Sequence, residues 1–576
     1  MKKLLTYLKP YRRESVLGPL FKLLEASFEL IVPLVVAAII DTGIRGGAGT
    51  GYVIRMALIL VLLGFVGLIC SVTAQFFAAK AAVGFTTRLR SALFSHIQTL
   101  SYQTIDSVGT STLITRITSD LNQVQSGLNL TLRLLLRSPF VVFGAMIMAF
   151  TVDAQSALWF VAAIPVLSVV VFGVMLISIP LYRRVQSHLD ALLGRSRENM
   201  TGVRVLRAFG KEEEEVKGFA EQNDRLTAMQ KKVGRCSALM NPVTYVIINL
   251  AIIALIHTGA LRVEAGIITQ GAVVALYNYM SQILVELIKM ANLIISITKA
   301  VACANRISAV LELPSEPAPA DQPSSSASKD CRVSFVNASL RYEGAGAESV
   351  EGITLDARPG ETIGVIGGTG SGKTTLVNLI PRFYEATGGA VLVNGKDVRS
   401  WDTSSLRQKI GLVPQKAVLF SGTVKENLLW GNSEATEADI ALALETAQAS
   451  EIVEKKGGLS AMVEAGGRNL SGGQRQRLTI ARALVRKPEI LILDDSSSAL
   501  DFATDAALRR ALRSLPWHPT VFIVSQRTSS IMHADRIIVL EDGKAAGIGT
   551  HAQLLESCAV YREIYNSQFR KEDARA

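Results

Sequence analysis

The sequence predicts two joined parts: a polytopic α-helical membrane domain with six transmembrane helices, and an α/β domain after it. Six apolar stretches in the first half are each long enough to cross a bilayer, which needs about 20 residues. The segment ELPSEPAPADQPSSSASKDC at 312–331 is rich in Pro, Ser and Ala, which is typical of a linker. Beyond it, short β-branched runs alternate with helical segments, a pattern that indicates a largely parallel sheet. The predicted domains are therefore 1–311 and 332–576.

The composition agrees with a membrane protein. Charged residues make up only 19% of the chain, against roughly 25% in soluble domains, and the mean hydropathy is +0.32. The net charge is +11, but residues 1–311 alone hold 30 Lys and Arg against 17 Asp and Glu. The basic excess therefore lies in the apolar half, where it predicts membrane topology and argues against nucleic acid as a partner. The five cysteines are scattered without a CxxC pair, which argues against a zinc site or a disulfide framework.

Two kinds of connection separate the apolar stretches. The breaks RGGAGTG, VDAQ and RVEAG are short and carry few positive charges, whereas the connections near 86–131 and 182–241 are long and polar. Because Lys and Arg near span ends favour the cytoplasm, the long connections and both termini are predicted to be cytoplasmic. Apolar residues recur in these connections at helical spacing, so spans two to five are expected to continue as long helices. The spans lie near 16–43, 53–84, 134–152, 156–181, 242–261 and 268–297.

A glycine-rich loop carries the chemistry of the second half. GGTGSGKT at 367–374 fits G-x-x-x-x-G-K-[ST] between an apolar strand and a helix, the context in which this P-loop binds ATP. Its backbone N–H groups and the helix N-terminus attract phosphate, and Lys373 reaches the terminal phosphates. Thr374 and Asp494, the latter ending the strand ILILD, are the predicted ligands of Mg²⁺. The predicted ATP-binding residues of the loop are Gly367, Gly368, Thr369, Gly370, Ser371, Gly372, Lys373, Thr374 and Thr375.

A second motif narrows the family. Leu470-Ser471-Gly472-Gly473-Gln474 precedes the ILILD strand and is followed by RQRLTIARAL. LSGGQ in this position resembles the signature of the ATP-binding cassette (ABC) transporters. With six spans ahead of it, the whole chain resembles a half-transporter of the ABC exporter type, in which an α/β P-loop NTPase domain carries a helical subdomain. The resemblance covers nearly all 576 residues.

The resemblance assigns further positions. It implies that Tyr342 stacks on adenine, that Gln415 contacts Mg²⁺ and the lytic water, and that Asp501 lies in a loop at the dimer interface. It also implies that two cassettes sandwich two ATP molecules head to tail, each ATP held by the Walker motifs of one chain and the signature of the other. The residues that would contact the ATP of a partner half-transporter are Ser471, Gly472, Gly473 and Gln474.

The membrane half resembles the same family. YLKPYRRE resembles the elbow helix that lies in the membrane interface, SVGTSTLITRITSDLNQVQ the first intracellular loop, and ENMTGVRVLRAFGKEEE the second. In the family these loops end in coupling helices that sit on the two nucleotide domains. The residues of the first loop that are in register with the family are Gly109, Leu113, Arg116 and Asp120.

Two positions depart from the family pattern. The residue after Asp494 is usually a Glu that polarises the attacking water, but here it is Asp495, and VSQR places Gln526 where the family has a switch histidine. A carboxylate misplaced by about 1 Å costs roughly 10²-fold in rate, and a lost contact to transition-state charge costs about 10²–10³-fold. His533 and His551 are interpreted as surface or capping residues. The predicted Walker site is therefore degenerate, and the chain is expected to be one half of a heterodimer whose partner holds the competent site.

A few ionisable side chains lie inside the predicted spans. Lys22, Glu25 and Glu29 share one helical face of the first span, and Glu286 and Lys289 are three residues apart on the last. Intramembrane charges usually face a bundle interior or a wet cavity. Two readings stay open: a local ion pair, or contact with a substrate. Under the second reading, Glu25 and Glu29 face the translocation pathway and favour cationic amphiphiles.

The leading reading is a multi-pass subunit of an ATP-driven exporter in a bacterial plasma membrane. It would contact membrane lipid and move amphipathic small molecules or lipids outward. Three alternatives stay open. The same architecture serves peptide export or siderophore uptake; the cassette could bind ATP in a regulatory subunit; or a homodimer could use Asp495 as a weak base.

Overall fold

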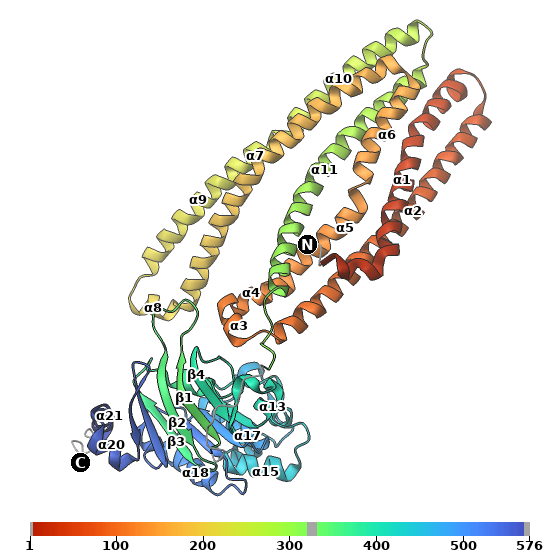
Figure 1. Ribbon diagram of the computed structural model, residues 1–576. Helices are drawn as coiled ribbons and strands as arrows, with labels where there is room; N and C mark the ends of the chain where they lie inside the picture. Colours follow the sequence, from red (N-terminus) through yellow and green to blue (C-terminus); the bar gives the residue numbers. More distant parts are fainter. Residues whose placement is uncertain (1–3, 320–330, 570–576) are drawn as a thin grey trace. The chain divides into compact units, whose positions relative to one another are not determined.

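The computed structural model describes residues 4–319 and 331–569, which divide into two compact units (Figure 1). The membrane unit comprises residues 1–98 and 111–313, and the nucleotide unit comprises residues 99–110 and 314–576. A short segment of the first half of the chain therefore belongs to the unit that the second half builds. Most of the predicted linker, residues 320–330, lies outside the described residues.

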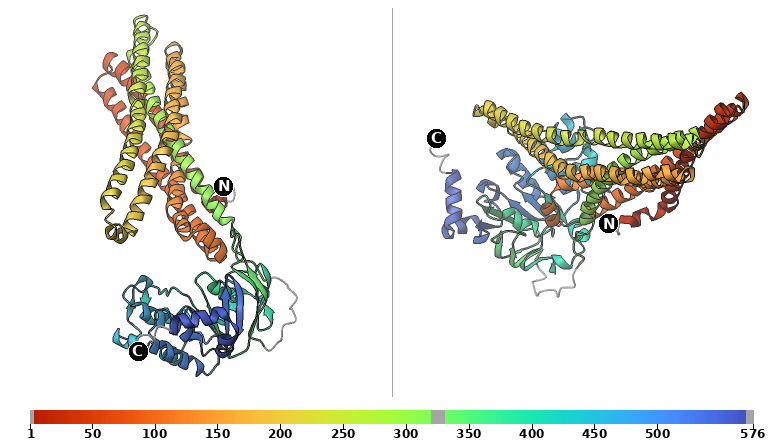
Figure 2. Two further views of the ribbon diagram at one scale, coloured as in Figure 1. Left: turned by 90° about the vertical axis from the view of Figure 1, so that its left-hand side faces the viewer. Right: turned by 90° about the horizontal axis from the view of Figure 1, so that it is seen from above.

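The membrane unit contains six helices long and apolar enough to span a bilayer, which confirms the predicted fold class of this half. The second, α2 (Thr50–Gln98), has 49 residues, more than the roughly 20 that a hydrocarbon core requires. Figures 1 and 2 show these helices as long rods, with α1 running alongside α2. The other helices of the unit are η1 (Leu4–Tyr11), α1 (Arg12–Ala38), η2 (Ile39–Arg45), α4 (Thr110–Thr115), η3 (Arg116–Asp120), α5 (Leu121–Leu134), α6 (Arg137–Val152), α7 (Ala154–Thr201), α8 (Val203–Ala208), α9 (Glu212–Ala238), α10 (Met240–Glu264) and α11 (Gln270–Leu311).

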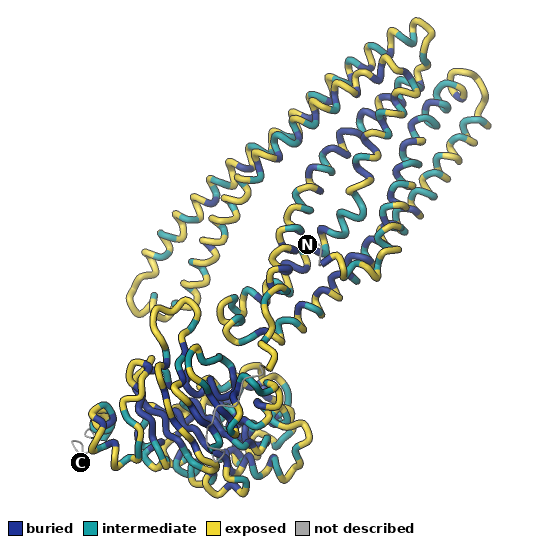
Figure 3. The backbone as a smooth tube through the Cα atoms, viewed as in Figure 1, coloured by how far each residue is buried: buried dark blue, intermediate teal, exposed yellow. Residues whose placement is uncertain are grey.

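Large apolar side chains cover the outside of α2. The tube in Figure 3 is exposed or half-buried along much of this helix. A helix that stays apolar on its exposed faces is typical of contact with lipid tails, because water would penalise such a surface. The exposed apolar residues in the first half of α2 include Leu58, Val61, Leu62, Phe65 and Leu68.

The interior of the membrane unit joins α1, α6, α7, α10 and α11 in one apolar cluster. Tyr279 on α11 is fully buried, and its Oη donates to the carbonyl oxygen of Leu30 on α1 at 2.7 Å. Gly127 on α5 lies so near α11 that a Cβ atom added there would be 2.2 Å from the Cβ of Ala300. A small residue at this crossing lets the two helices approach closely.

The charges that the sequence analysis singled out in the spans are paired, and two of the ion pairs join separate helices. Lys22 and Glu25 form a local ion pair at 2.5 Å, as the first of the two sequence readings expects. Glu29 on α1 and Glu286 on α11 both pair with Arg137 on α6, each at 2.6 Å. Glu25 and Glu29 are therefore each paired with a cation of the same unit, and whether they contact a substrate stays a prediction. Arg137 was missed in the sequence because its partners lie 108 and 149 positions away.

The nucleotide unit is built on two sheets, which confirms the predicted α/β class. The larger sheet has the order β12-β11-β3-β10-β9-β6 and is parallel except for β12. The smaller sheet, β2-β1-β4-β5, is antiparallel. Because β3, β10 and β9 are parallel neighbours, the loops after them meet at one edge. The strands are β1 (Val333–Leu340), β2 (Val350–Ala357), β3 (Thr362–Gly367), β4 (Gly388–Val393), β5 (Lys396–Asp397), β6 (Ile410–Val413), β7 (Gly422–Thr423), β8 (Met462–Val463), β9 (Ile490–Asp494), β10 (Thr520–Val524), β11 (Arg536–Glu541) and β12 (Lys544–Gly549).

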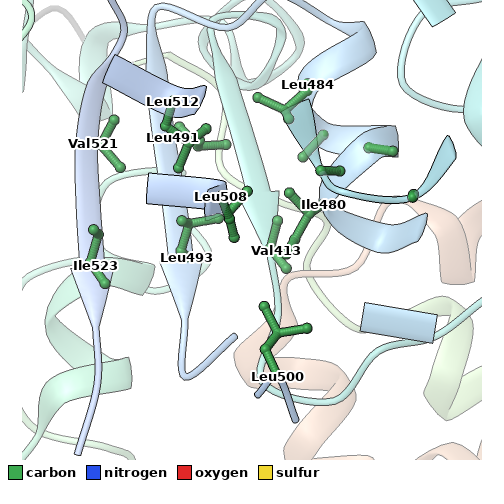
Figure 4. Packing of buried hydrophobic residues seen from close by; sticks show 14 of the residues in the cluster. Val413, Ile480, Leu484, Leu491, Leu493, Leu500, Leu508, Leu512, Val521 and Ile523 are labelled. Atoms are coloured by element: carbon green, nitrogen blue, oxygen red, sulfur yellow. The ribbon is translucent and has the colours of Figure 1, made fainter. Parts of the chain in front are cut away.

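Helices complete this unit, and those between β6 and β9 form the helical subdomain that the resemblance implies. Figure 4 shows buried side chains of β6, β9 and β10 close to those of α17 and α18. The labelled residues are Val413, Leu491, Leu493, Val521 and Ile523 from the strands, Ile480 and Leu484 from α17, Leu508 and Leu512 from α18, and Leu500. The helices are α12 (Lys373–Asn378), η4 (Val398–Ser400), α13 (Thr403–Gln408), α14 (Val424–Leu429), α15 (Glu437–Thr446), α16 (Ser450–Lys455), η5 (Ala465–Gly467), α17 (Gly472–Val485), α18 (Phe502–Arg513), α19 (Thr528–Ile531), α20 (His551–Ser557) and α21 (Ala559–Phe569).

The short helix α3 (Tyr102–Val108) belongs to the nucleotide unit although it precedes the third span. The ring of Tyr102 stacks on that of Phe383 with centroids 4.2 Å apart, and the Arg407 guanidinium lies 5.2 Å from the Phe383 centroid. The Tyr384 Oη donates to the Asp106 carboxylate at 2.5 Å. Burial and this carboxylate raise the pKa of Tyr384, so its hydroxyl stays protonated as a donor. One aromatic and one charged contact thus hold α3 in place.

We predict that Tyr384→Phe loosens the segment 99–110 without unfolding the nucleotide unit. The substitution keeps the ring and removes only the hydrogen bond to Asp106, and a bond to a charged group contributes about 1.5–3 kcal/mol. Amide hydrogen exchange in peptides from this segment should become roughly ten- to a hundredfold faster. Tyr565→Phe on α21 is the control and should leave this exchange unchanged. Equal exchange in Tyr384→Phe and wild type would contradict the assigned role.

Candidate nucleotide-binding site

The loop between β3 and α12 forms the phosphate cradle that the sequence predicts. Gly370 and Gly372 have φ of +83° and +89°, a left-handed conformation that glycine adopts without strain. A Cβ atom added at Gly372 would lie 2.3 Å from the Ser349 carbonyl oxygen, so only glycine fits there. The Lys373 Nζ lies inside the curl and donates to the carbonyl oxygens of Gly367 at 2.9 Å and Gly368 at 2.5 Å. The loop therefore holds its own cation where phosphate oxygens would lie.

Acidic side chains face this cation from the end of β9. The Thr374 Oγ1 donates to Asp494 Oδ1 at 3.0 Å, which joins the two predicted Mg²⁺ ligands. Asp495 follows with φ +47°, and its backbone N–H donates to the Val524 carbonyl oxygen at 2.9 Å. Its carboxylate accepts a hydrogen bond from the Gln415 side chain. The sheet order thus brings together motifs that are about 120 residues apart.

These residues line a cavity of about 380 Å³. Tyr342 lies at its wall, where its Oη is 3.1 Å from Thr375 Oγ1 and its ring meets the Tyr384 ring edge-on at 5.0 Å. Gln526, after β10, also lines the cavity. Gly367, Gly368 and Ser371 are not among the lining residues and instead form the curl around Lys373. The predicted site residues in the lining are Tyr342, Thr369, Gly370, Gly372, Lys373, Thr374, Thr375, Gln415, Asp494, Asp495 and Gln526.

The electrostatics of the cavity suit a magnesium–nucleotide complex. Burial raises the pKa of Asp494 and of Asp495, and burial lowers the pKa of Lys373. The charged forms of all three groups would therefore be stabilised by a bound cation and by phosphate. The hydroxyl of Thr374, the carboxylate of Asp494 and the amide oxygen of Gln415 are the oxygen ligands that Mg²⁺ prefers. The residues present fit ATP with Mg²⁺.

The loop after β10 is tied to two other parts of the nucleotide unit. The Gln526 carbonyl oxygen accepts from Gln568 Nε2 on α21 at 2.8 Å. The Arg527 guanidinium donates to the carbonyl oxygens of Ser498 at 3.3 Å and Leu500 at 3.2 Å, in the segment before Asp501. The sequence predicted Gln526 as a site residue but gave no role to Arg527. The place of Arg527 in VSQR is the feature of the sequence that could have pointed to it.

The signature lies outside the cavity. Ser471 caps α17: its Oγ accepts from the Gln474 N–H at 3.3 Å, and the Gln474 side chain accepts from the Ser471 N–H at 3.0 Å. Asp501 likewise caps α18 by accepting from the Thr504 N–H at 2.9 Å. Neither Asp501 nor the predicted signature residues Ser471, Gly472, Gly473 and Gln474 belong to the cavity lining.

The two histidines after the switch position also lie outside the cavity lining. His551 is at the start of α20, where its Nδ1 is 2.7 Å from the Tyr561 Oη, and burial lowers its pKa. The carbonyl oxygen of His533 accepts a hydrogen bond from the Arg513 side chain. Both contacts are structural, as the sequence reading expects.

Comparison with known proteins extends the likeness to the whole chain. Residues 15–287 match the family described as ABC transporter transmembrane region, and residues 350–498 match the family described as ABC transporter. An uncharacterized ABC transporter ATP-binding protein of Mycobacterium tuberculosis is 39% identical over 568 residues, 98% of this chain and 97% of its own. An ATP-dependent lipid A-core flippase of Hahella chejuensis is 30% identical over 581 residues, 99% of this chain and 97% of its own.

A solved structure shares the fold. The structure of a bacterial Atm1-family ABC exporter with ATP bound has a TM-score of 0.80 at 23% identity, over 97% of this chain and 98% of that chain. In the described part of the chain, six helices long and apolar enough to span a membrane precede an α/β cassette that contains the glycine-rich loop, the predicted Mg²⁺ ligands and the LSGGQ segment. The chain belongs to the ABC transporter family, as a half-transporter of the exporter type with its transmembrane region ahead of its ATP-binding cassette.

Proposed function

We propose that this chain is one subunit of an ATP-driven exporter in a bacterial plasma membrane that moves amphipathic small molecules or lipids outward. The observation that carries the proposal is the separation of the two halves of the ATP site. Lys373 and Asp494 line one cavity, and Ser471 lies outside it. A second half-transporter therefore supplies a signature to this cavity and receives Ser471 at its own ATP. The distribution of Lys and Arg supports a cytoplasmic nucleotide unit and cytoplasmic termini.

The class of cargo is supported by the surface of the membrane unit and by one relative. Exposed apolar side chains along α2 imply a lipid environment, from which an amphiphile can enter. The relative in Hahella chejuensis carries the name of a lipid A-core flippase, a transporter of an amphipathic lipid. Both observations favour an amphiphile over a water-soluble peptide or siderophore.

The Walker site of this chain is proposed to hydrolyse ATP slowly. Lys373 would hold the phosphates, and Thr374, Asp494 and Gln415 would hold Mg²⁺, which would supply positive charge to stabilise the phosphoryl group. Asp495 follows β9 at the position where the family has a Glu and lines the cavity, and its carboxylate is one methylene shorter than that of Glu. Gln526 lines the cavity but brings no positive charge. ATP binding is thus preserved while the groups that act in the transition state are weakened.

A homodimer is the second candidate. It is favoured by the position of Asp495, which lines the cavity and accepts a hydrogen bond from Gln415. A base would act from that place, so two copies of the chain could turn over ATP with a weak base in each site. In a homodimer every ATP site would contain Asp495 of one copy and Ser471 of the other, so Asp495→Asn and Ser471→Ala would both strongly lower turnover, whereas the heterodimer requires opposite effects.

We predict that Lys373→Ala strongly reduces nucleotide binding at this chain's Walker site. The substitution removes the main cation facing the β- and γ-phosphates, and a hydrogen bond to a charged group contributes about 1.5–3 kcal/mol, which is roughly 10- to 100-fold in affinity. Labelling of this subunit by a photoactivated ATP analogue should fall accordingly. Lys409→Ala is the control, because Lys409 pairs with Glu489 outside the cavity lining. Unchanged labelling of Lys373→Ala would refute the cradle assignment.

We predict opposite effects for two substitutions in the assembled heterodimer. Asp495→Asn should leave most ATP turnover in place, because little hydrolysis occurs at this site. Ser471→Ala should lower turnover about tenfold or more, because it removes a γ-phosphate contact from the partner's competent site. Steady-state ATPase rates at saturating Mg-ATP are the measurement.

The control separates the phosphate contact from helix capping. Ser471 also caps α17, and losing such a cap costs about 1 kcal/mol. Thr550 caps α20 with the same reciprocal geometry but lies outside the cavity lining, so Thr550→Ala removes a cap alone. A near-complete loss of turnover in Asp495→Asn with a mild effect of Ser471→Ala would instead establish this chain's site as the working one.

A further inference from the structure

The membrane unit contains a cavity of about 410 Å³ between α1, α6 and α11. One part of its lining is apolar, formed by Val32, Val36 and Val285. Another part is polar, with the side chains of Gln282 and Asn278. A lining of both kinds suits a ligand that has an apolar chain and a polar head.

The polar side of the cavity is connected to the ion pairs of the spans. Arg137 and Glu286 form the buried centre, with side chains only 7% and 4% exposed. Glu29 and Lys289 form the ends, with side chains 42% and 44% exposed. Lys289 contacts Glu286 at 2.8 Å, and Glu29 contacts Arg137 at 2.6 Å. The cavity therefore presents one accessible carboxylate and one accessible ammonium, both lining it.

The charges of this network cancel. The chain of contacts from Glu29 through Arg137 and Glu286 to Lys289 holds two carboxylates and two cations, and the neighbouring Lys22–Glu25 pair is neutral as well. A ligand with a net charge would leave one charge uncompensated in a medium of low dielectric, which is costly. A zwitterion adds no net charge and can still form an ion pair at each end.

An unpartnered atom shows where a donor would bind. The Gln282 Oε1 is buried and has no hydrogen-bond partner among the described residues, and Gln282 lines the cavity. A buried acceptor without a donor is destabilising unless a ligand or water satisfies it. An ammonium group bearing N–H bonds could donate to this oxygen and to Glu29.

We propose that this cavity binds a zwitterionic amphiphile, with its ammonium group at Glu29 and Gln282 and its anionic group at Lys289. The inference rests on the proposed exporter function and names the class of its cargo. The apolar chain lies against the valine side of the cavity. The headgroup replaces one intramolecular ion pair at each end without changing the net charge.

Equilibrium binding to the purified full transporter tests this directly. The probe is radiolabelled lysophosphatidylethanolamine, in the nonionic detergent dodecyl maltoside and without nucleotide. Unlabelled lysophosphatidylethanolamine should compete at least tenfold better than lysophosphatidylglycerol, which is anionic, or hexadecyltrimethylammonium, which is cationic. Equal or better competition by either singly charged amphiphile would overturn the proposal.

Two single substitutions should shift the preference in opposite directions. Glu29→Gln leaves the network with a net positive charge, so lysophosphatidylglycerol should become the best competitor. Lys289→Gln leaves a net negative charge, so hexadecyltrimethylammonium should become the best competitor. Lys299→Gln is the matched control: it removes a charge from the same helix, α11, outside the cavity lining, and should not change the order.

The outcomes remain distinguishable where one variant fails to fold. The ion pair of Lys289 with Glu286 lies within one helix and does not join two helices as that of Glu29 does, so Lys289→Gln tests the proposal even where Glu29→Gln is unstable. Absence of the shift in a folded Lys289→Gln protein would refute the assignment. Because binding is measured without ATP, its failure leaves the Lys373 and Ser471 tests of the exporter function unaffected.

Discussion

The Lys373 ammonium and the carboxylates of Asp494 and Asp495 attract one another in the candidate nucleotide site, on which the other predicted site residues converge. These groups meet because β3, β10 and β9 are parallel neighbours whose carboxyl ends share one edge. Burial disfavours the charged form of all three side chains, as their shifted pKa values show. Phosphate and a divalent cation would stabilise the charged forms of all three groups. The proposed dependence on ATP is consistent with this constraint.

The membrane unit also contains buried charged groups, and it balances them with its own side chains. Glu29, Arg137, Glu286 and Lys289 come from three helices, and their two negative and two positive charges cancel within the unit. A buried charge in a bilayer is costly, so each carboxylate has a cation within 2.6 Å. Because the balance is internal, the cavity beside it discriminates by the net charge of a ligand. The proposed nucleotide site is stabilised by the charges of a bound ligand. The proposed cavity of the membrane unit instead favours a ligand that leaves the net charge of its ion pairs unchanged.

Tyr384 contacts both α3 and the wall of the nucleotide cavity. Its hydroxyl donates to Asp106 on α3, and its ring meets edge-on the ring of Tyr342 at the wall of the nucleotide cavity. The Tyr342 hydroxyl in turn contacts Thr375 beside the phosphate loop. These contacts link the wall of the nucleotide cavity to α3, a helix that the first half of the chain contributes to the nucleotide unit.

The sequence by itself determined the features that depend on short stretches of chain. Six apolar runs predicted the spans, and the strand–loop–helix pattern around Lys373 predicted the phosphate-binding loop. Both features depend on consecutive residues, because these determine the length of an apolar run and the local backbone geometry. It also predicted that Gln415, Asp494 and Gln526 act together, through resemblance to the family. Only the tertiary structure decided the partners of Arg137 and the place of α3. Those contacts join residues more than a hundred positions apart, and no local pattern specifies which distant helix or loop packs against another.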